Sequence, residues 1–235
     1  MKVVDIIKSV RWCIDEEAVN ATGFADASAY DFDNGTHTDN GLMNNIIKNN
    51  IGAALKWVCL NAPSSLLSCG DITVGQGVSK VEPIKEETIQ TVTDNLITPT
   101  YAPLRVIRVR GANWHKAIMT ESLLSEDSEE YLELRNSDGA EATIDRPQAA
   151  LIHTKVKKIE VWPTTDAGDF TITYAVAPNS TDIEALKTDS TEVNIPPMVE
   201  TSFIYYLAFL LLVAYGDSRS EKMLSIAKQN VGAGE

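Results

Sequence analysis

The end of the chain carries the feature that most constrains its fold. Two prolines, Pro196 and Pro197, precede an apolar run from Phe203 to Tyr215, and Gly216 follows the run. Proline at the start and glycine at the exit are typical of a single helix. The run is apolar nearly all the way round, so a helix there must be buried on more than one side. Its partners are either other segments of this chain or other copies of it.

The same run is short for a membrane span. It has thirteen residues, whereas a helix that crosses a bilayer needs about 20. Polar residues flank it on both sides, namely Glu200, Thr201, Ser202, Asp217 and Arg219. We therefore expect burial in protein and no membrane. The N-terminal residues 1–8 carry charges inside their apolar stretch, which is unlike a secretory signal, so we expect a cytoplasmic product.

The charge of the chain limits its possible partners. The net charge of −13 leaves no basic stripe that could hold a phosphate backbone by attraction. It does not exclude DNA that slides past, because an acidic surface repels a polyanion. The three cysteines, Cys13, Cys59 and Cys69, are an odd number and no pair has a metal-ligand spacing. We expect buried thiols in a reducing compartment.

Helical periodicity dominates the first quarter of the chain. Apolar residues recur at helical spacing over residues 3–16 and predict an amphipathic helix. Residues 17–40 are small, polar and acidic, show no period, and predict a long loop. A second helix is predicted from about Gly41 to Asn61, capped by Asp39 or Asn40 and ended by Pro63.

The middle of the chain changes to strand periodicity. Residues 64–103 are mixed, with short strands expected at 71–78 and 87–93. Alternation over 104–110 predicts a strand, in which Arg108 and Arg110 share a face with Val106. Further strands are expected at 113–119 and 150–156. Two hairpins are predicted, one from 131–135 and 140–144 and a clearer one from 158–163 and 170–176. Together these strands form a small antiparallel sheet or a sandwich.

The order of these elements predicts an α+β fold in which the N-terminal and C-terminal helices form a helical bundle with an inserted antiparallel β-module. The predicted regions are N-terminal helices with an acidic loop (17–40) over 1–62, a β-rich module over 63–178, and a connector with C-terminal helices over 179–235. Residues 1–62 and 196–235 form one helical unit. Residues 219–230 either continue the last helix at an angle or form a separate tail helix.

No residue pattern points to catalysis, a cofactor or a metal. Gly75-Gln-Gly77 lacks the full phosphate-loop pattern. His37, His115 and His153 are scattered and lack helical metal-ligand spacing. Residues 31–35 share residue types with calcium loops but lack the terminal Glu, and the acidic run 125–130 suits a solvated loop. We therefore expect no cofactor, no metal and no enzymatic activity.

The chain resembles the head–tail adaptor proteins of tailed bacteriophages, also called connector or neck-ring proteins. Residues 3–17 resemble their opening helix and acidic segment. The strands at 104–110, 158–163 and 170–178 resemble their central strands. Residues 195–200, 204–208 and 214–217 resemble their closing helix. These segments cover most of the chain outside 17–40 and 64–100.

This resemblance implies a structural virion protein. Such proteins form a ring, usually a homododecamer, below the portal protein, extend the DNA channel used for DNA ejection, and dock the tail or further neck proteins. The chain would be assembled in the host cytoplasm and located in the virion neck. Acidic side chains that face the lumen would let DNA pass without specific binding. The C-terminal segment of the family often reaches the portal, which makes Arg219, Lys222 and Lys228 portal-contact candidates.

Aromatic residues of the closing helix have two interpretations. Tyr205, Tyr206, Phe209 and Tyr215 either pack in the core or contact a neighbouring subunit, and we take them as subunit-interface candidates. Two other functions stay open. One is a soluble carbohydrate-processing or ligand-binding β-domain with helical decoration, which would use paired carboxylates. The other is a membrane-anchored subunit with residues 203–215 inserted.

Overall fold

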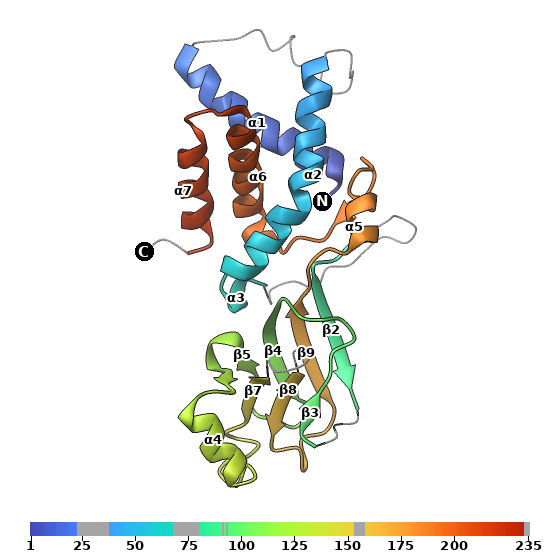
Figure 1. Ribbon diagram of the computed structural model, residues 1–235, viewed down its shortest axis with the longest axis vertical. Helices are drawn as coiled ribbons and strands as arrows, with labels where there is room; N and C mark the ends of the chain where they lie inside the picture. Colours follow the sequence, from blue (N-terminus) through green and yellow to red (C-terminus); the bar gives the residue numbers. More distant parts are fainter. Residues whose placement is uncertain (23–37, 68–79, 91, 93, 153–157, 233–235) are drawn as a thin grey trace. The chain divides into compact units, whose positions relative to one another are not determined.

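The computed structural model describes residues 1–22, 38–67, 80–90, 92, 94–152 and 158–232. The fold is α+β, as the sequence predicts, with seven α-helices and three sheets in the described ranges. The chain divides into two compact units (Figure 1). Unit 1 consists of Met1–Pro83 and Ala177–Glu235, and unit 2 of Ile84–Val176.

Helix α6, Glu200–Tyr215, is the central element of unit 1. It contacts α1 (Val3–Thr22), α2 (Thr38–Asn61) and α7 (Ser220–Asn230). Its buried residues are Ser202, Phe203, Ile204, Leu207, Ala208, Leu211 and Leu212. A short 3-10 turn, η3 (Pro197–Val199), leads into α6, and Gly216 ends it in the left-handed conformation at φ 68°. The predicted proline start and glycine exit are therefore both present.

The N-terminus is fastened to the segment before α6. The Met1 ammonium donates to the Val193 carbonyl (2.9 Å), and the Val3 and Val4 amides donate to Thr191 and Asp189 carbonyls. Strand β10 (Glu192–Val193) also pairs in parallel with β1 (Lys80–Val81). These bonds satisfy the first amides of α1, which have no partner within the helix. Two distant parts of the chain are thus joined at the start of α1.

The ends of the first two helices differ from the sequence prediction. Helix α1 continues through Thr22 and α2 begins at Thr38, so the predicted loop over 17–40 is wrong at both of its ends. Asp39 and Asn40 lie inside α2 instead of capping it. Small and acidic residues are compatible with a helix even where no apolar stripe marks one, because periodicity reports burial and not helicity. A four-residue helix, α3 (Ser64–Leu67), follows α2.

The polar segment expected as a connector after residue 178 contains regular structure. Helix α5, Ser180–Ala185, is held by a capping box between Asn179 and Asp182, in which each side chain accepts from the other residue's backbone amide. The Leu186 side chain after it is buried. A polar sequence with a good cap can therefore form a helical turn without an apolar stripe.

Unit 2 contains two four-stranded sheets. The first has the order β2-β9-β4-β5 and is antiparallel throughout; the second has the order β3-β8-β7-β6. In the second sheet β6 runs parallel to β7, which corrects the prediction of a purely antiparallel module. The strands are β2 (Ile84–Ile89), β3 (Leu96–Ile97), β4 (Arg105–Gly111), β5 (Ile118–Met119), β6 (Leu124–Ser125), β7 (Gln148–Ile152), β8 (Lys158–Trp162) and β9 (Phe170–Ala175).

One hydrophobic core lies between the two sheets. Val109 and Ile172 from the first sheet and Ile159 and Val161 from the second belong to the same buried cluster. Trp114 packs edge-on against Phe170, with ring centroids 5.3 Å apart. This is the packing of a sandwich, in which the inner faces of two sheets interdigitate.

The clearer of the two predicted hairpins is wrong. Its strands exist as β8 and β9, but they do not pair. Strand β8 pairs with β3 and β7, whereas β9 pairs with β2 and β4. The residues between them carry the chain from one sheet to the other. Both strands are buried along nearly their whole length, as expected of strands inside facing sheets and not of a one-sided hairpin.

The other predicted hairpin is a helix. Residues Glu129–Asn136 form α4, whose first turn is capped by the Ser128 hydroxyl accepting from the Tyr131 amide (3.2 Å). The turn sequence expected to join two strands instead ends this helix, and the Gly139 amide donates to the Leu134 carbonyl (2.8 Å) at φ 70°. Tyr131 and Leu134 then pack against Ala150 and Trp162 on the second sheet.

Strand β4 also departs from simple alternation. A bulge shifts its register between Val106 and Arg108, so Val106 and Ile107 are both buried and Val106 does not share the face of Arg108. Arg105 pairs with Glu121 (3.3 Å) and Arg108 with Glu86 (3.0 Å). Of the other predicted strands, 113–119 is reduced to β5 and 87–93 overlaps β2, while 71–78 lies outside the described residues.

Gly139 provides a stability test of unit 2. A Cβ at this position would lie 2.3 Å from Cδ1 of Trp162, and φ is +70°. We expect Gly139→Ala to lower the free energy of unfolding by about 3 kcal/mol, because a backbone strain and a steric overlap add. Gly216→Ala is the control: its φ is +68°, but no atom lies within 4 Å of the added Cβ, so it should cost about 1 kcal/mol. Equal losses in denaturant unfolding would show that Trp162 does not crowd Gly139.

Candidate functional site

The most informative surface of unit 1 is one side of α6 that the unit's own helices cover only in part. Tyr205, Tyr206, Phe209 and Leu210 are half-buried, and Val213 and Tyr215 are exposed by 51% and 46%. Residues 205, 209 and 213 follow each other at intervals of four, so they lie along one side of the helix. We call the set Tyr205, Tyr206, Phe209, Leu210 and Val213 the α6 stripe. Tyr215 is exposed at the C-terminal end of α6 but lies on the opposite side of the helix, in line with the buried Leu211.

Two of the four interface candidates, Tyr206 and Phe209, are half-buried and make aromatic contacts within their own chain. The Tyr206 ring stacks on Trp57 of α2, with centroids 4.2 Å apart and planes 7° from parallel, and lies 5.5 Å from the Phe209 ring. Burial raises the pKa of the Tyr206 hydroxyl. This stack fixes α2 against α6. Tyr205 lines a groove beside α1, and Tyr215 is 46% exposed at the C-terminal end of α6.

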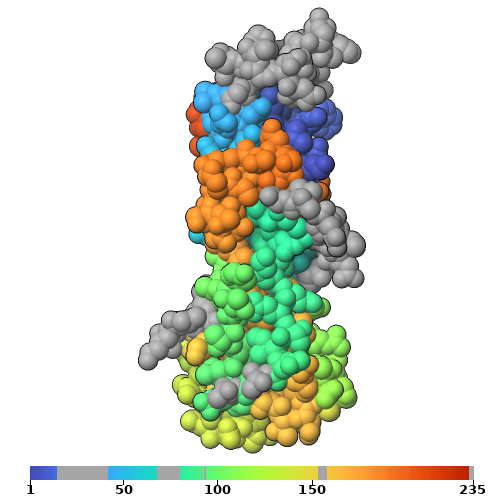
Figure 2. Space-filling model, turned by 90° about the vertical axis from the view of Figure 1, so that its right-hand side faces the viewer, coloured from blue at the N-terminus to red at the C-terminus, as the bar shows by residue number. Residues whose placement is uncertain are grey.

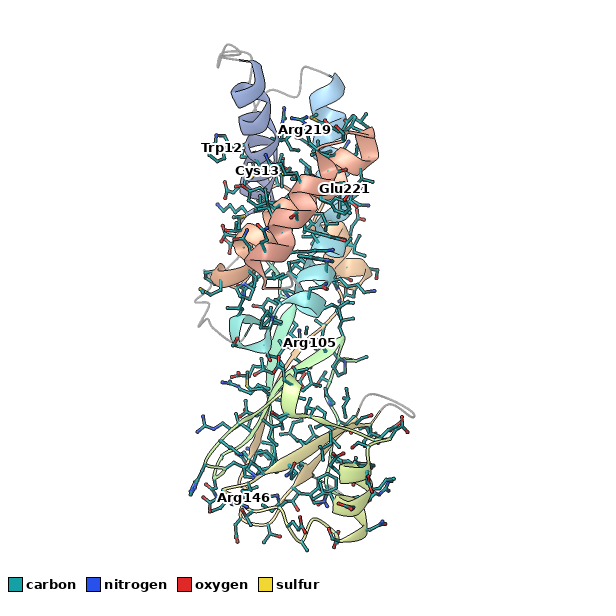
Figure 3. The ribbon with its side chains drawn as sticks, turned by 90° about the vertical axis from the view of Figure 1, so that its left-hand side faces the viewer. Trp12, Cys13, Arg105, Arg146, Arg219 and Glu221 are labelled. Atoms are coloured by element: carbon teal, nitrogen blue, oxygen red, sulfur yellow. The ribbon has the colours of Figure 1, made fainter. Side chains whose placement is uncertain are left out.

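A groove runs between α1 and α6 beside Tyr205. It has a volume of about 520 Å³ and a mainly apolar lining formed by Lys8, Ser9, Trp12, Cys13, Glu200, Thr201, Ile204 and Tyr205. Trp12 is 61% exposed and points away from the helices (Figure 3). Sequence reasoning missed this groove. The sequence feature that could have indicated it is Trp12. This large apolar residue lies on the side of α1 opposite the buried residues Val3, Ile6, Val10 and Ile14.

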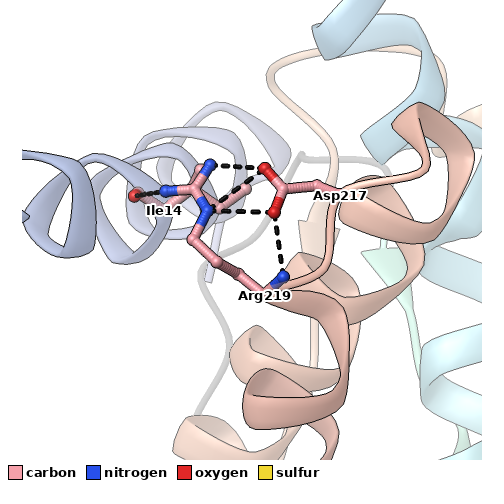
Figure 4. A network of polar contacts seen from close by, with 3 residues as sticks. All are labelled: Ile14, Asp217 and Arg219. Carbon is pink, nitrogen blue, oxygen red and sulfur yellow. Dashed lines mark hydrogen bonds and ion pairs between the residues drawn. The ribbon is translucent and has the colours of Figure 1, made fainter.

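Arg219, a portal-contact candidate, is bonded within its own chain (Figure 4). Its guanidinium donates to both oxygens of Asp217, the shortest bond being 2.7 Å, and its Nη1 donates to the Ile14 carbonyl at 3.3 Å. The Arg219 amide also donates to Asp217 Oδ1 (2.9 Å). These bonds tie the turn between α6 and α7 to α1. The arginine therefore has a structural role in unit 1, and its contact with a partner stays a prediction.

The other two portal-contact candidates lie on α7. Lys222 and Lys228 are exposed, whereas Met223 and Ala227 of the same helix are buried. Helix α7 is a separate helix, the second of the two alternatives considered for residues 219–230. Its buried residues face α6, with which it has extensive contact, and both lysines are exposed to solvent.

Unit 2 has a second hollow, of about 720 Å³, between α4 and the second sheet. Its lining includes Glu130, Glu133 and Glu141 together with Asn136, Ser137 and Gln148. Within the ranges that the structure describes, no group of three His, Cys, Asp or Glu side chains has the geometry of a metal site. His115 pairs with the Asp145 carboxylate on the surface.

A buried carboxylate holds α4 to the sheet near this hollow. The Tyr131 hydroxyl donates to Glu160 Oε2 (2.7 Å) and accepts from Arg135 Nη1 (3.2 Å). Burial and the bond to Glu160 raise the pKa of the Tyr131 hydroxyl. The network satisfies the buried oxygen of Glu160, which is a structural role.

Several residues weighed in the sequence lie outside the described part of the chain. They are His37, Cys69, Gly75, Gly77, His153 and the segment 31–35. Cys13 is half-buried beside the groove and Cys59 is buried in α2.

One segment of the described residues, Pro197–Tyr215, is long and apolar enough to cross a membrane by length and composition. It reaches this length because the turn before α6 and the first three residues of the helix, Glu200–Ser202, add to the thirteen-residue run. About 44% of it is buried within the protein, and three helices contact it. Packing of this kind is typical of a core helix.

Comparison of the chain with protein-family models gave no match, and comparison with curated proteins gave no significant match.

The bond between Asp217 and Arg219 makes a testable contribution to stability. Hydrogen bonds from Arg219 lower the pKa of Asp217 from 3.8 to about 2. A carboxyl whose pKa is lowered by folding stabilises the folded state above its unfolded pKa and loses this effect as the pH falls through its folded pKa. We expect Asp217→Asn to cost about 1 kcal/mol at neutral pH.

The cost of Asp217→Asn should shrink as the pH falls from about 3.8 to about 2. Unfolding free energies of both proteins across this range measure it, and subtracting them removes the titration of other carboxyl groups. A cost that does not change with pH would contradict the assigned role. Asp182→Asn serves as a comparison, because that carboxylate caps α5 and not the α6–α7 turn.

Proposed function

We propose that the chain is a structural virion protein, a head–tail adaptor that forms a ring below the portal of a tailed bacteriophage. The observation that carries the proposal is the α6 stripe. The most apolar helix of the chain is covered by α1, α2 and α7 on most sides, and it keeps Val213 and Tyr215 exposed and Tyr205 at the edge of an open groove. Apolar surface of this kind marks interaction sites.

In this proposal α1, α2, α6 and α7 form a helical bundle in each subunit. The α6 stripe and the α1–α6 groove are different surfaces of the same bundle, so contact between the stripe of one copy and the groove of the next is head-to-tail. Head-to-tail contacts close into a ring when the rotation between copies divides a full turn. The family resemblance gives twelve copies for that ring.

The remaining parts of the proposal concern partners. In this proposal Lys222 and Lys228, both exposed on α7, contact an acidic surface of the portal, and Arg219 precedes them in the chain while holding the α6–α7 turn. The other side of the ring docks the tail or further neck proteins. The net charge of −13 suits a lumen through which DNA passes without adhering. Such a protein acts in the virion neck after assembly in the host cytoplasm, and needs no cofactor.

The direct experiment is co-assembly with the cognate portal protein. Electron micrographs of the mixture should show an added annulus of density on the portal. A monomeric state of the isolated chain is compatible with the proposal, because adaptors of this family often assemble into a ring only on the portal. Absence of annular density and of any co-migration with portal would contradict it.

A substitution in the α6 stripe sharpens this test. Val213 is 51% exposed, so Val213→Asp should change the unfolding free energy by less than about 1 kcal/mol. It should nevertheless abolish the annulus, because a charge at an apolar contact must be desolvated. Leu132→Asp, at a residue of α4 that is 52% exposed, is the matched control and should assemble normally. Annuli from both variants would show that the α6 stripe is not the ring contact.

A further inference from the structure

The outer strand β2 differs from the other sheet edges of unit 2. Each sheet has two outer strands, and three of these four, β3, β5 and β6, have two residues each. Strand β2 has six residues, all in unbroken register with β9. Natural sheets usually keep their edges short or interrupted, because a long regular edge is a template for another strand.

The free side of β2 is accessible. None of its six residues is buried, and residues of this part of the sequence lie at the surface of unit 2 in Figure 2. In an antiparallel ladder only alternate residues of an edge strand direct their amide and carbonyl groups to the neighbour. The amide and carbonyl groups of one set of alternate β2 residues bond to β9. In the described part of the chain, no strand bonds to the groups of the other set.

Side-chain bonds on both faces hold β2 rigid. On one face Glu86 Oε2 accepts from Arg108 Nη2 (3.0 Å) and from the Thr173 hydroxyl (3.1 Å), so a row of three residues crosses three strands. On the other face Glu87 accepts from the Tyr174 hydroxyl and from the Thr100 amide (3.0 Å). Burial and the bond to Glu87 raise the pKa of that tyrosine. The edge is therefore ordered before any partner arrives.

We propose that β2 pairs antiparallel with β2 of a second copy across a two-fold axis, so that two first sheets join into one. The charges of the strand favour a single register. When the axis passes beside Glu86, Lys85 of each copy lies opposite Glu87 of the other, and Ile84 lies opposite Thr88. An axis at Lys85 or at Glu87 would set two like charges opposite each other with no attractive pair beside them, whereas the axis at Glu86 adds two attractive pairs.

This register leaves the two Glu86 residues facing each other at the centre. Each is already matched by Arg108 of its own sheet, so the pair is not an uncompensated repulsion. A foreign strand would need an acid opposite Lys85 and a base opposite Glu87 to fit equally well. Strand β2 itself carries this pattern when its direction is reversed, which is why the second copy is the favoured occupant.

The contact is independent of the proposed ring, because a two-fold pairing uses the same surface on both copies, whereas a ring contact uses two different surfaces. It predicts a dimer of the isolated 235-residue chain. Sedimentation equilibrium across a dilution series measures the dimer, and amide hydrogen exchange locates it. Alternate amides of Ile84–Ile89 that exchange quickly in the monomer should slow as the protein concentration rises.

Charge reversal tests the register. Lys85→Glu converts two attractive pairs into two repulsive ones and should weaken dimerisation by roughly tenfold or more, with part of the loss restored in high salt. Lys85→Gln should have an intermediate effect. Lys116→Glu makes the same change of charge at an exposed position away from β2 and should leave the dimer unchanged. Unfolding of each variant at low concentration checks that the monomer is intact.

Four results would overturn the proposal. The chain could stay monomeric at all concentrations, it could dimerise while the β2 amides exchange freely, or it could dimerise equally well with Lys85→Glu. Protection of β2 by a segment of another protein, with the chain itself monomeric, would also overturn self-pairing. All of these measurements use the chain without portal, so their failure is distinct from a failure to form an annulus on the portal.

Discussion

The burial of α6 organises unit 1. This helix is apolar around most of its circumference, and no single neighbour can cover such a surface. Helices α1, α2 and α7 each take part of it, and they come from both ends of the chain. The stack of Trp57 on Tyr206 and the bonds from Arg219 to Asp217 and Ile14 then fix the angles at which they pack. Unit 1 is thus a discontinuous unit because one helix requires several partners.

Coverage of α6 is incomplete in a particular direction, and this makes unit 1 a candidate for assembly. The half-buried residues lie between α2 and the groove beside α1, and the last turn of the helix is open to solvent. Unit 2 buries its apolar residues differently, between two sheets that face each other and under α4. Its notable surface is a backbone edge with charged side chains. The two units therefore offer contacts of different chemistry, one apolar and one based on main-chain hydrogen bonds.

Local sequence signals predicted the elements better than their partners. The helix over Glu200–Tyr215 and the strands β4, β8 and β9 follow from periodicity and from proline and glycine. The pairing of β8 and β9 did not follow, because a short turn between two apolar strands serves equally for a hairpin and for a change of sheet. Helix α4 was missed because its cap at Ser128 and its end at Gly139 resemble turn signals.

The candidate surface was predictable in the same partial way. The aromatic residues of α6 stand out in the sequence, and the exposed position of Trp12 follows from the helical wheel of α1. Which tyrosine stacks on Trp57 and which lies open depends on how α2 crosses α6, and no local pattern carries that information. The internal role of Arg219 likewise required the position of the Ile14 carbonyl.

The insertion of unit 2 within unit 1 has a consequence for synthesis. Ile84 and Ala175 are direct partners in the β2–β9 ladder, so the chain enters and leaves unit 2 at neighbouring points. Unit 2 is continuous in sequence and can close its core while the nascent chain is still on the ribosome. Helices α1 and α2 emerge first, yet they must wait for residues 200–230 before their apolar stripes are covered. During that interval the nascent chain exposes the apolar surfaces of α1 and α2, although unit 2 has already folded. A chaperone that binds apolar surface would act at this stage.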